Sequence, residues 1–249
     1  MKVYQEDKRT IFLSQFKDPL MDHLYQKILI HLDEAPGGEI LDIGCGIGKV
    51  AFWATQRGFK VTGIDREKKA IEIAQEILQK LEKKIRPQFI LGNFMETMSL
   101  KGKKFDAIIC SEVIEHLDEP GKFLQKAKQL LKKGGLFILT VPRSKKLWTV
   151  ADEYAQHKRR FEINEVKDFF KGYKILHLYT VGFPFMIILF FTHHLWVNFF
   201  HFQSSGSWRK SKVKTSIYYP FASVLLKIDD LFNSLNLGTN IVIAVQRKK

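Results

Sequence analysis

Apolar runs of strand length alternate with segments of helical period through the middle of the chain. The predicted strands are residues 39–44, 60–65, 87–92, 105–111 and 136–142, and helices follow the first, second and fourth of them. The helix after the second strand carries isoleucine, alanine and leucine on one face and lysines on the other, as in helices that cover a sheet. Strands this apolar need cover on both faces. The pattern therefore predicts a doubly wound, mostly parallel α/β sheet.

The helix after the fourth strand begins at Pro120 and is expected to end at Gly134 and Gly135, since helices favour proline in the first turn and glycine at the end. Residues from about 8 to 32 are predicted to form one or two amphipathic helices, either a lid or a packing helix. The remaining predicted elements are a short helix at about 162–170, a sixth strand at 173–182 and a final strand at 240–249. We divide the chain into an N-terminal helical lid (1–35), a core (36–182), an insertion (183–239) and the last strand (240–249).

Composition and charge narrow the class of protein. With 249 residues, 45% of them hydrophobic and 27% charged, the chain can bury one sizeable core, and we expect one domain with an insertion. Cys45 and Cys110 fit no metal or redox spacing, and residues 1–10 are too polar for a secretory signal, which predicts a reducing, cytoplasmic compartment. The formal net charge of +14 predicts an anionic partner: a nucleic acid, an acidic lipid surface or a charged small molecule.

The first predicted strand ends in a glycine-rich loop, "ILDIGCGIGKV" at 40–50. A Gly-x-Gly turn lets the chain bend sharply and lets a ligand approach the backbone at a helix N-terminus. A dinucleotide fingerprint requires a small residue three positions after the second glycine, where this chain has Lys49. Asp42 would also add negative charge beside a pyrophosphate. The loop therefore favours a cationic ligand.

Residues 39–141 resemble the class I S-adenosylmethionine-dependent methyltransferases, whose first motif reads hydrophobic-hydrophobic-Asp-x-Gly-x-Gly-x-Gly. The resemblance implies a Rossmann-like sheet of seven strands and S-adenosyl-L-methionine as cofactor. It places the methionine part of the cofactor on Gly44, Cys45, Gly46 and Gly48, with Asp42 near the amino group. Asp65 would bind the ribose hydroxyls, although it could instead cap the following helix. Arg66 and Phe94 would contact the adenine, and Asn93 stands where the family commonly has Asp.

The fourth strand ends in "ICSEVIEHLDEP" at 109–120, which looks like the "EHL" segment of the quinone and sterol branch of the family. It does not resemble the Asn-Pro-Pro-Tyr segment of many base-methylating enzymes, and this difference argues against a nucleic acid as the methyl acceptor. Ser111 and Glu112 are expected to contact the cofactor. His116 is the candidate base for a hydroxyl acceptor, or else a structural histidine that holds the loop.

A polar stretch, "DEYAQHKRRFE", follows the fifth strand at the sheet edge where ligands of such folds bind. Its candidate acceptor-binding residues are Tyr154, His157, Arg159 and Arg160. Arginine could grip a carboxylate, phosphate or phenolate with two hydrogen bonds. The alternative is a solvated charge cluster that caps a helix.

Residues 175–208 contain no Lys, Arg, Asp or Glu. A single membrane crossing within 183–208 would separate two strands that should be neighbours, and a second span is interrupted by Pro220, Lys227, Asp229 and Asp230. The run is therefore expected to lie on an anionic membrane, to cap the acceptor pocket, or to form an oligomer interface or subdomain core. Aromatic residues such as Trp196 and the cations of 208–214 favour the membrane interface. His193, His194 and His201 have no acidic partner nearby, and no metal is predicted.

Together these features predict methyl transfer, with oxygen the favoured acceptor atom, to a lipophilic small molecule at the inner face of the membrane. Homo-oligomerisation through 183–208 is a further expectation. One alternative is an RNA methyltransferase, suggested by the net charge of +14. Another is a non-catalytic S-adenosylmethionine-binding adaptor at a membrane.

Overall fold

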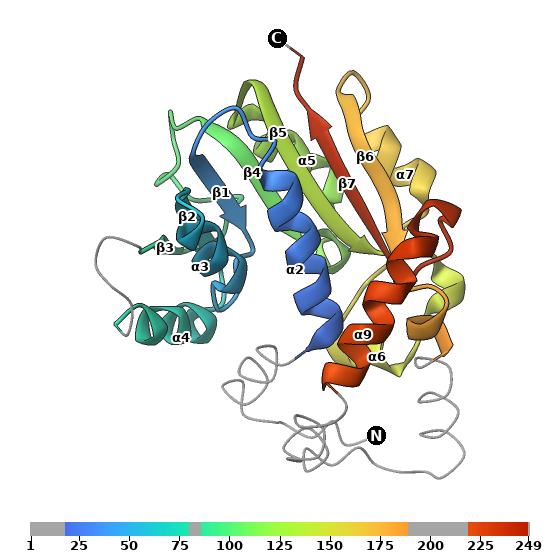
Figure 1. Cartoon of the computed structure of the whole chain (residues 1–249). Coiled ribbons are helices and arrows are strands. Elements are labelled where there is room, and N and C mark those ends of the chain that lie inside the picture. The colour runs from blue at the N-terminus through green and yellow to red at the C-terminus, as the bar shows by residue number, and fades with distance from the viewer. Residues whose placement is uncertain (1–17, 80–85, 189–218, 249) are drawn as a thin grey trace.

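One sheet of seven strands organises the computed structural model, which describes residues 18–79, 86–188 and 219–248. The strands are β1 (Glu39–Ile43), β2 (Lys60–Asp65), β3 (Gln88–Leu91), β4 (Phe105–Ser111), β5 (Leu131–Pro142), β6 (Lys174–Val181) and β7 (Asn240–Gln246). Their order is β3-β2-β1-β4-β5-β7-β6 (Figure 1). Strand β7 runs antiparallel to both β5 and β6, whereas the pairs from β3 to β5 are parallel. The predicted doubly wound, mostly parallel sheet is confirmed.

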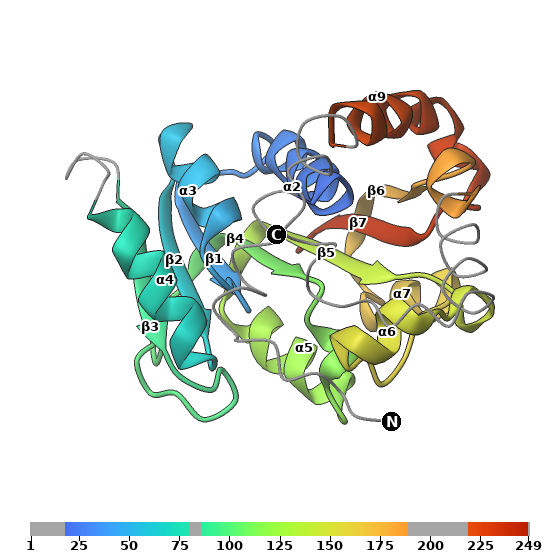
Figure 2. The ribbon, with the colours of Figure 1, turned by 90° about the horizontal axis from the view of Figure 1, so that it is seen from below.

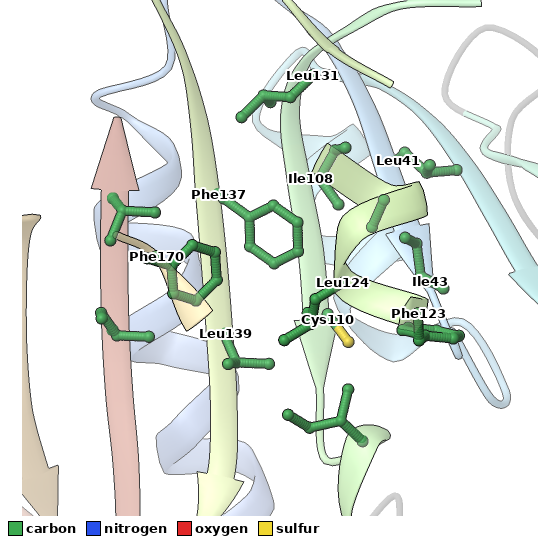
Figure 3. Close-up of a cluster of buried hydrophobic side chains, with 14 of the residues drawn as sticks. Leu41, Ile43, Ile108, Cys110, Phe123, Leu124, Leu131, Phe137, Leu139 and Phe170 are labelled. Carbon is green, nitrogen blue, oxygen red and sulfur yellow. The ribbon is translucent and has the colours of Figure 1, made fainter. Parts of the chain in front are cut away.

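Helices cover both faces of this sheet. They are α2 (Pro19–Leu32), α3 (Lys49–Gln56), α4 (Lys68–Leu78), α5 (Pro120–Gln129), α6 (Val150–Ala155), α7 (Ile163–Phe169) and α9 (Tyr219–Asp229). Figure 2 shows α2, α3 and α9 on one side of the central strands and α5 and α7 on the other. Side chains of each strand alternate between the two cores. Leu41 and Ile43 join Phe137 beneath α5 and α7 (Figure 3), while Ile40 joins Ile138 beneath α2 and α3.

The helix after β4 ends earlier than the sequence predicts. It ends at Gln129, and Leu131 already pairs with Phe105 as the first residue of β5. The ladder then shifts register between Phe105 and Ala107. The predicted end at Gly134–Gly135 was wrong because the apolar spacing of this segment suits either element, and Leu131 is fully buried as a strand residue.

The ends of the predicted insertion lie together. Strands β6 and β7 pair as neighbours, and residues 182–239 connect them. The carboxylate of Asp229, at the end of α9, accepts hydrogen bonds from the backbone amides of Phe185 and Met186 at 2.9 and 3.1 Å. Residues 189–218 lie outside the described part of the chain, and with them Phe190, Phe191, Trp196 and the three histidines named above. Within the described ranges, no helix combines the length and apolarity that a bilayer crossing requires.

Helix α2 packs on the sheet and on α9. Leu24, Ile28 and Leu32 are fully buried, so this helix forms part of the core. Residues 8–17 of the predicted lid or packing helix lie outside the described part of the chain. Asp230 fastens α9 to α2 through His23 at 2.9 Å and Lys27 at 2.6 Å. The first turn of α2 serves a second purpose, because it reaches the pocket described next.

Candidate active site

A pocket of about 720 Å³ lies at the carboxyl ends of β1, β2 and β4. Parallel α/β sheets bind ligands at this edge. The first half of α2 and the segment 151–160 complete its wall. The predicted site residues among its lining are Asp42, Gly44, Cys45, Gly46, Asp65, Arg66, Asn93, Phe94, Ser111, Glu112, His116, Tyr154, His157 and Arg160. Gly48 and Arg159 lie outside the lining.

The glycines of the loop after β1 have different tasks. Gly44 has φ +73°, and a Cβ there would lie 2.3 Å from the Val113 side chain, so a larger residue does not fit. Gly46 also has a positive φ, +53°, but a Cβ there would meet nothing within 4 Å. This open space faces the pocket, so ligand atoms can approach the backbone closely. Gly48 supports the loop from behind, where a Cβ would collide with Phe89 at 2.2 Å.

Asp42 is a buried carboxylate on the pocket wall. It is 3% exposed, and its Oδ2 has no hydrogen-bond partner. Burial, and then the charge of Asp65, raises the pKa of Asp42 to about 7. A buried carboxyl without a partner is costly, and a cationic group in the pocket would satisfy it. The site therefore fits the ammonium end of S-adenosylmethionine.

Asp65 ties the end of β2 to the glycine loop. Its Oδ2 accepts from the Gly46 amide and its Oδ1 from the Glu67 amide, both at 2.8 Å. Burial raises the pKa of Asp65, while these two amides lower it. The N-cap position of α4 is held by Glu67, so Asp65 is not the N-cap residue of this helix. The carboxylate still has free lone pairs toward the pocket, as the predicted ribose contact requires.

The turn after β3 provides an aromatic wall. Phe94 is 5% exposed and packs against Phe123 with ring centroids 4.9 Å apart. Asn93 is exposed; its Oδ1 accepts from the Met95 amide at 3.0 Å, and its Nδ2 donates to Glu96 at 2.7 Å. Because an amide oxygen accepts two hydrogen bonds, Asn93 retains one acceptor position.

The end of β4 is held rigidly. Glu112 has φ +54°, a conformation that L residues rarely adopt. The hydroxyl of Thr140 and the amide of Asn240 donate to its two carboxylate oxygens, each at 3.0 Å. Ser111 shares a 2.8 Å hydrogen bond with the same Thr140. These contacts, which join β4, β5 and β7, aim the loop that follows at the pocket.

That loop places Glu115 and His116 next to His157, which follows α6. Glu115 is fully buried with no hydrogen-bond partner on either oxygen, and burial followed by the charge of Glu112 raises its pKa well above the usual value. Its Oε1 lies 3.7 Å from His116 Nε2 and 3.9 Å from His157 Nε2. Burial and the neighbouring His157 lower the pKa of His116. One ligand atom from each of the three lies within 4.8 Å of the others, so this set could hold a metal ion as well as move a proton.

Asp152 organises the part of the pocket wall formed by residues 151–160. Arg160 reaches it with two hydrogen bonds of 2.8 and 3.0 Å, and Asp152 Oδ1 lies 2.8 Å from His157 Nδ1. Asp152 also accepts from the Thr149 amide and so begins α6, a helix that the sequence did not predict. Although burial opposes ionisation, these hydrogen bonds hold the pKa of Asp152 at about 2. A carboxylate thus orients His157 with its Nε2 toward Glu115.

The two predicted arginines already have partners within the chain. Three N–H donors of the Arg160 guanidinium bind Asp152 and the carbonyl of Arg143, although the residue lines the pocket. Arg159 donates to the carbonyl of Asp118 at 3.2 Å outside the pocket lining. Asp152 and Arg160 are buried and not solvated. Tyr154 and His157 remain at the pocket.

Sequence reasoning missed Tyr25 and Asp152 as pocket residues of consequence. Tyr25 reaches the pocket from α2, and burial together with Asp42 raises its pKa. The sequence signal that could have identified Tyr25 is its polar hydroxyl on an otherwise apolar face of the helix. Lys49, the residue that argues against a dinucleotide loop, is buried, pairs with Asp22 of α2 and lies over the Trp53 ring at 5.1 Å.

The sheet order, the antiparallel last strand and the glycine loop beside two acidic residues define the class I methyltransferase fold. The chain belongs to the methyltransferase-domain family: the family model described as "Methyltransferase domain" matches residues 34–202. This membership confirms the predicted resemblance to the methyltransferase family.

Among curated proteins, the chain is similar to a ubiquinone biosynthesis O-methyltransferase of Rickettsia typhi. They are 31% identical over 165 residues, which are 65% of this chain and 64% of the relative. This chain thus spans less than two thirds of that relative. Among solved structures, the cyclase SpnF has a TM-score of 0.63 at 17% identity, over 92% of this chain and 82% of the other. Magnesium protoporphyrin IX methyltransferase from Synechocystis PCC 6803 has a TM-score of 0.58 at 15% identity, over 92% and 86%. These structures support the fold.

Proposed function

We propose that this protein binds S-adenosyl-L-methionine in the pocket between β1, β2 and β4 and transfers its methyl group to an oxygen of a lipophilic small molecule. The observation that supports cofactor binding best is that two carboxylates flank the glycine loop. They are Asp42 in β1, whose buried Oδ2 has no hydrogen-bond partner, and Asp65 at the end of β2, which binds the Gly46 amide. The carboxylate of Asp42 suits the ammonium group of the cofactor, and that of Asp65 suits the two ribose hydroxyls.

The cofactor supplies a methyl group already activated on sulfonium, so the chain's own task is to align the acceptor and remove its proton. His157 fits the second task. Asp152 holds its Nδ1 at 2.8 Å, which leaves Nε2 to accept a proton and provides a negative charge that stabilises the protonated ring. His116, the base predicted from the sequence, lies beside it with ring centroids 4.9 Å apart. We assign the base to His157 and a supporting position to His116.

Two features favour a lipophilic acceptor. Leu20, Met21, Val113 and Leu117 line the pocket, and neither arginine of the 159–160 pair offers a free guanidinium there. The curated relatives are named ubiquinone biosynthesis O-methyltransferases, which makes hydroxylated quinone precursors the first acceptors to test.

The exposed face of α9 supports action at the inner, cytoplasmic face of a membrane. Phe221, Val224, Ile228, Leu231 and Leu235 recur at spacings of three and four residues and are 39% to 78% exposed. This stripe lies on α9 and the turn after it, while Ala222 and Leu226 of the same helix are fully buried. Figure 1 shows α2 and α9 side by side, both beginning at the edge of the sheet where the pocket lies. A peripheral protein docked through this face would present its pocket to lipid-dissolved acceptors.

A labelling experiment tests the proposal. The purified protein is incubated with S-adenosylmethionine carrying a labelled methyl group and with either a bacterial lipid extract or total RNA. We expect label in the lipid fraction that survives mild alkaline hydrolysis, because an ether resists base and a methyl ester does not. Label in RNA would favour the nucleic-acid alternative, and cofactor binding without label in either fraction would favour the adaptor.

A further inference from the structure

A second group of histidine and carboxylate side chains lies apart from the pocket, where the end of α2 meets β6. His31 is in the last turn of α2, Glu34 follows the helix, and His177 projects from β6. The rings of His31 and His177 stack with centroids 4.3 Å apart. Glu34 Oε1 lies 2.7 Å from His177 Nε2 and 3.5 Å from His31 Nδ1. One ligand atom from each of the three lies within 4.8 Å of the other two.

His31 has one nitrogen in use and one without a partner. Its Nε2 lies 2.7 Å from the hydroxyl of Tyr179, which fixes the ring in place. Its Nδ1 is buried without a hydrogen-bond partner, and the side chain is only 7% exposed. A metal-binding histidine has the same arrangement, with one nitrogen held by an oxygen and the other directed at the metal. The tautomer that leaves Nδ1 with a lone pair has its Nε2 proton on the Tyr179 side.

The spacing suits a small divalent cation. Zinc ligands lie about 2.0–2.2 Å from the metal, so two ligands of a tetrahedron are about 3.3–3.6 Å apart. The pair formed by His31 and Glu34, at 3.5 Å, already has this separation. The pair formed by Glu34 and His177, at 2.7 Å, is hydrogen-bonded and would have to open by less than 1 Å. Both side chains are about 40% exposed, which leaves them room to move and gives a metal a path of entry.

We propose that His31, Glu34 and His177 form a binding site for a zinc-like divalent cation, with water as the fourth ligand. Two imidazoles and one carboxylate are ligands that zinc accepts readily. The metal would fasten the end of α2 to β6. Because the first turn of the same helix lines the pocket, the site would stiffen the element that borders the cofactor and acceptor.

The test uses the full chain with His116→Asn as parent, so that the second histidine–carboxylate set at the pocket loses a ligand. Metal-free parent is titrated with Zn²⁺ by calorimetry and with Co²⁺ by visible absorption. We expect one equivalent of Co²⁺ with the intense bands of a four-coordinate ion, and a higher melting temperature with Zn²⁺. Adding His177→Asn or Glu34→Gln should weaken binding by more than about 100-fold, and Tyr179→Phe by about 10–100-fold.

His23→Asn is the matched control, because it removes a histidine from the same helix and should leave affinity unchanged. Glu34 and His177 are exposed enough to be replaced without unfolding the chain, so the test does not depend on the buried His31. The site assignment is wrong if the parent takes up no Zn²⁺ or Co²⁺, or if it binds them as tightly after both exposed ligands are replaced. The trio is then only a set of hydrogen bonds between α2 and β6.

Discussion

The Oδ2 atom of Asp65 lies 2.8 Å from the backbone nitrogen of Gly46. This contact joins the end of β2 to the loop after β1 and places the carboxylate at the pocket. Asp65 therefore stabilises the glycine loop and is also in position for the proposed contact with the ribose.

Replacing Asp65 by alanine should weaken cofactor binding. Hydrogen bonds to a charged group contribute about 1.5–3 kcal/mol each, so the loss corresponds to at least a 10-fold to 100-fold weaker affinity. Calorimetry with S-adenosylmethionine measures it. Glu72→Gln, on the outer side of α4, is the matched control and should bind like the native chain. An undiminished affinity of Asp65→Ala would remove this residue from the site.

Asp42 should make the native chain less stable at high pH. Burial raises its pKa in the folded chain to about 7, whereas in the unfolded chain it ionises near 3.8. The folded state thus holds a proton that the unfolded state has lost, and the free energy of unfolding falls as pH rises from about 4 to 7. The full cost above pH 7 is at most roughly 4 kcal/mol.

Asp42→Asn removes this titration. The free energy of unfolding of the variant minus that of the native chain should be larger at pH 8 than at pH 5. Urea unfolding at both pH values measures this difference. It should also lose cofactor affinity, because the amide has no charge for an ammonium group. If variant and native chain differ in free energy of unfolding by the same amount at pH 5 and pH 8, the pKa of Asp42 is not raised.

His157→Asn should lower kcat by about 10²–10⁴-fold, the usual contribution of a general base, with cofactor affinity within twofold of the native chain. Asp152→Asn should lower kcat as well, because it removes the charge that stabilises protonated His157. His116→Asn should have the smaller effect. If His116→Asn is the more damaging of the two histidine variants under saturating cofactor, the base assignment belongs to His116, as the sequence predicts.

Lipid docking should depend on the exposed stripe of α9. The triple variant Phe221→Ser, Val224→Ser, Leu231→Ser should lose flotation with anionic liposomes, because it removes the three most exposed apolar side chains of the stripe. The control replaces three exposed apolar residues elsewhere, Leu91, Met98 and Ile175. Flotation that is lost in neither variant, or equally in both, would contradict docking through α9. The predicted lipid contact of Trp196 needs a separate variant.

The sequence alone determined the sheet and most of the residues that line the pocket around the glycine loop. Strand patterns are periodic and local, and the glycine loop with Asp42 and the acid at the end of β2 is a motif of close sequence spacing. The end of α5 was predicted wrongly because the apolar pair at 130–131 is compatible with a helix and with a strand. Only the pairing of Leu131 with Phe105 in the sheet decides between the two.

Only the tertiary structure brought together the side chains of residues 152–160. Arg160 was predicted to bind an anionic acceptor, but it pairs with Asp152. The same carboxylate lies 2.8 Å from Nδ1 of His157, which supports our proposal of His157 as the base. The cluster of His31, Glu34 and His177 was likewise invisible, since 143 residues separate Glu34 from its partner histidine. Residue types and local periodicity are written in the sequence, whereas the partner of each buried charge depends on which distant elements the sheet order brings together.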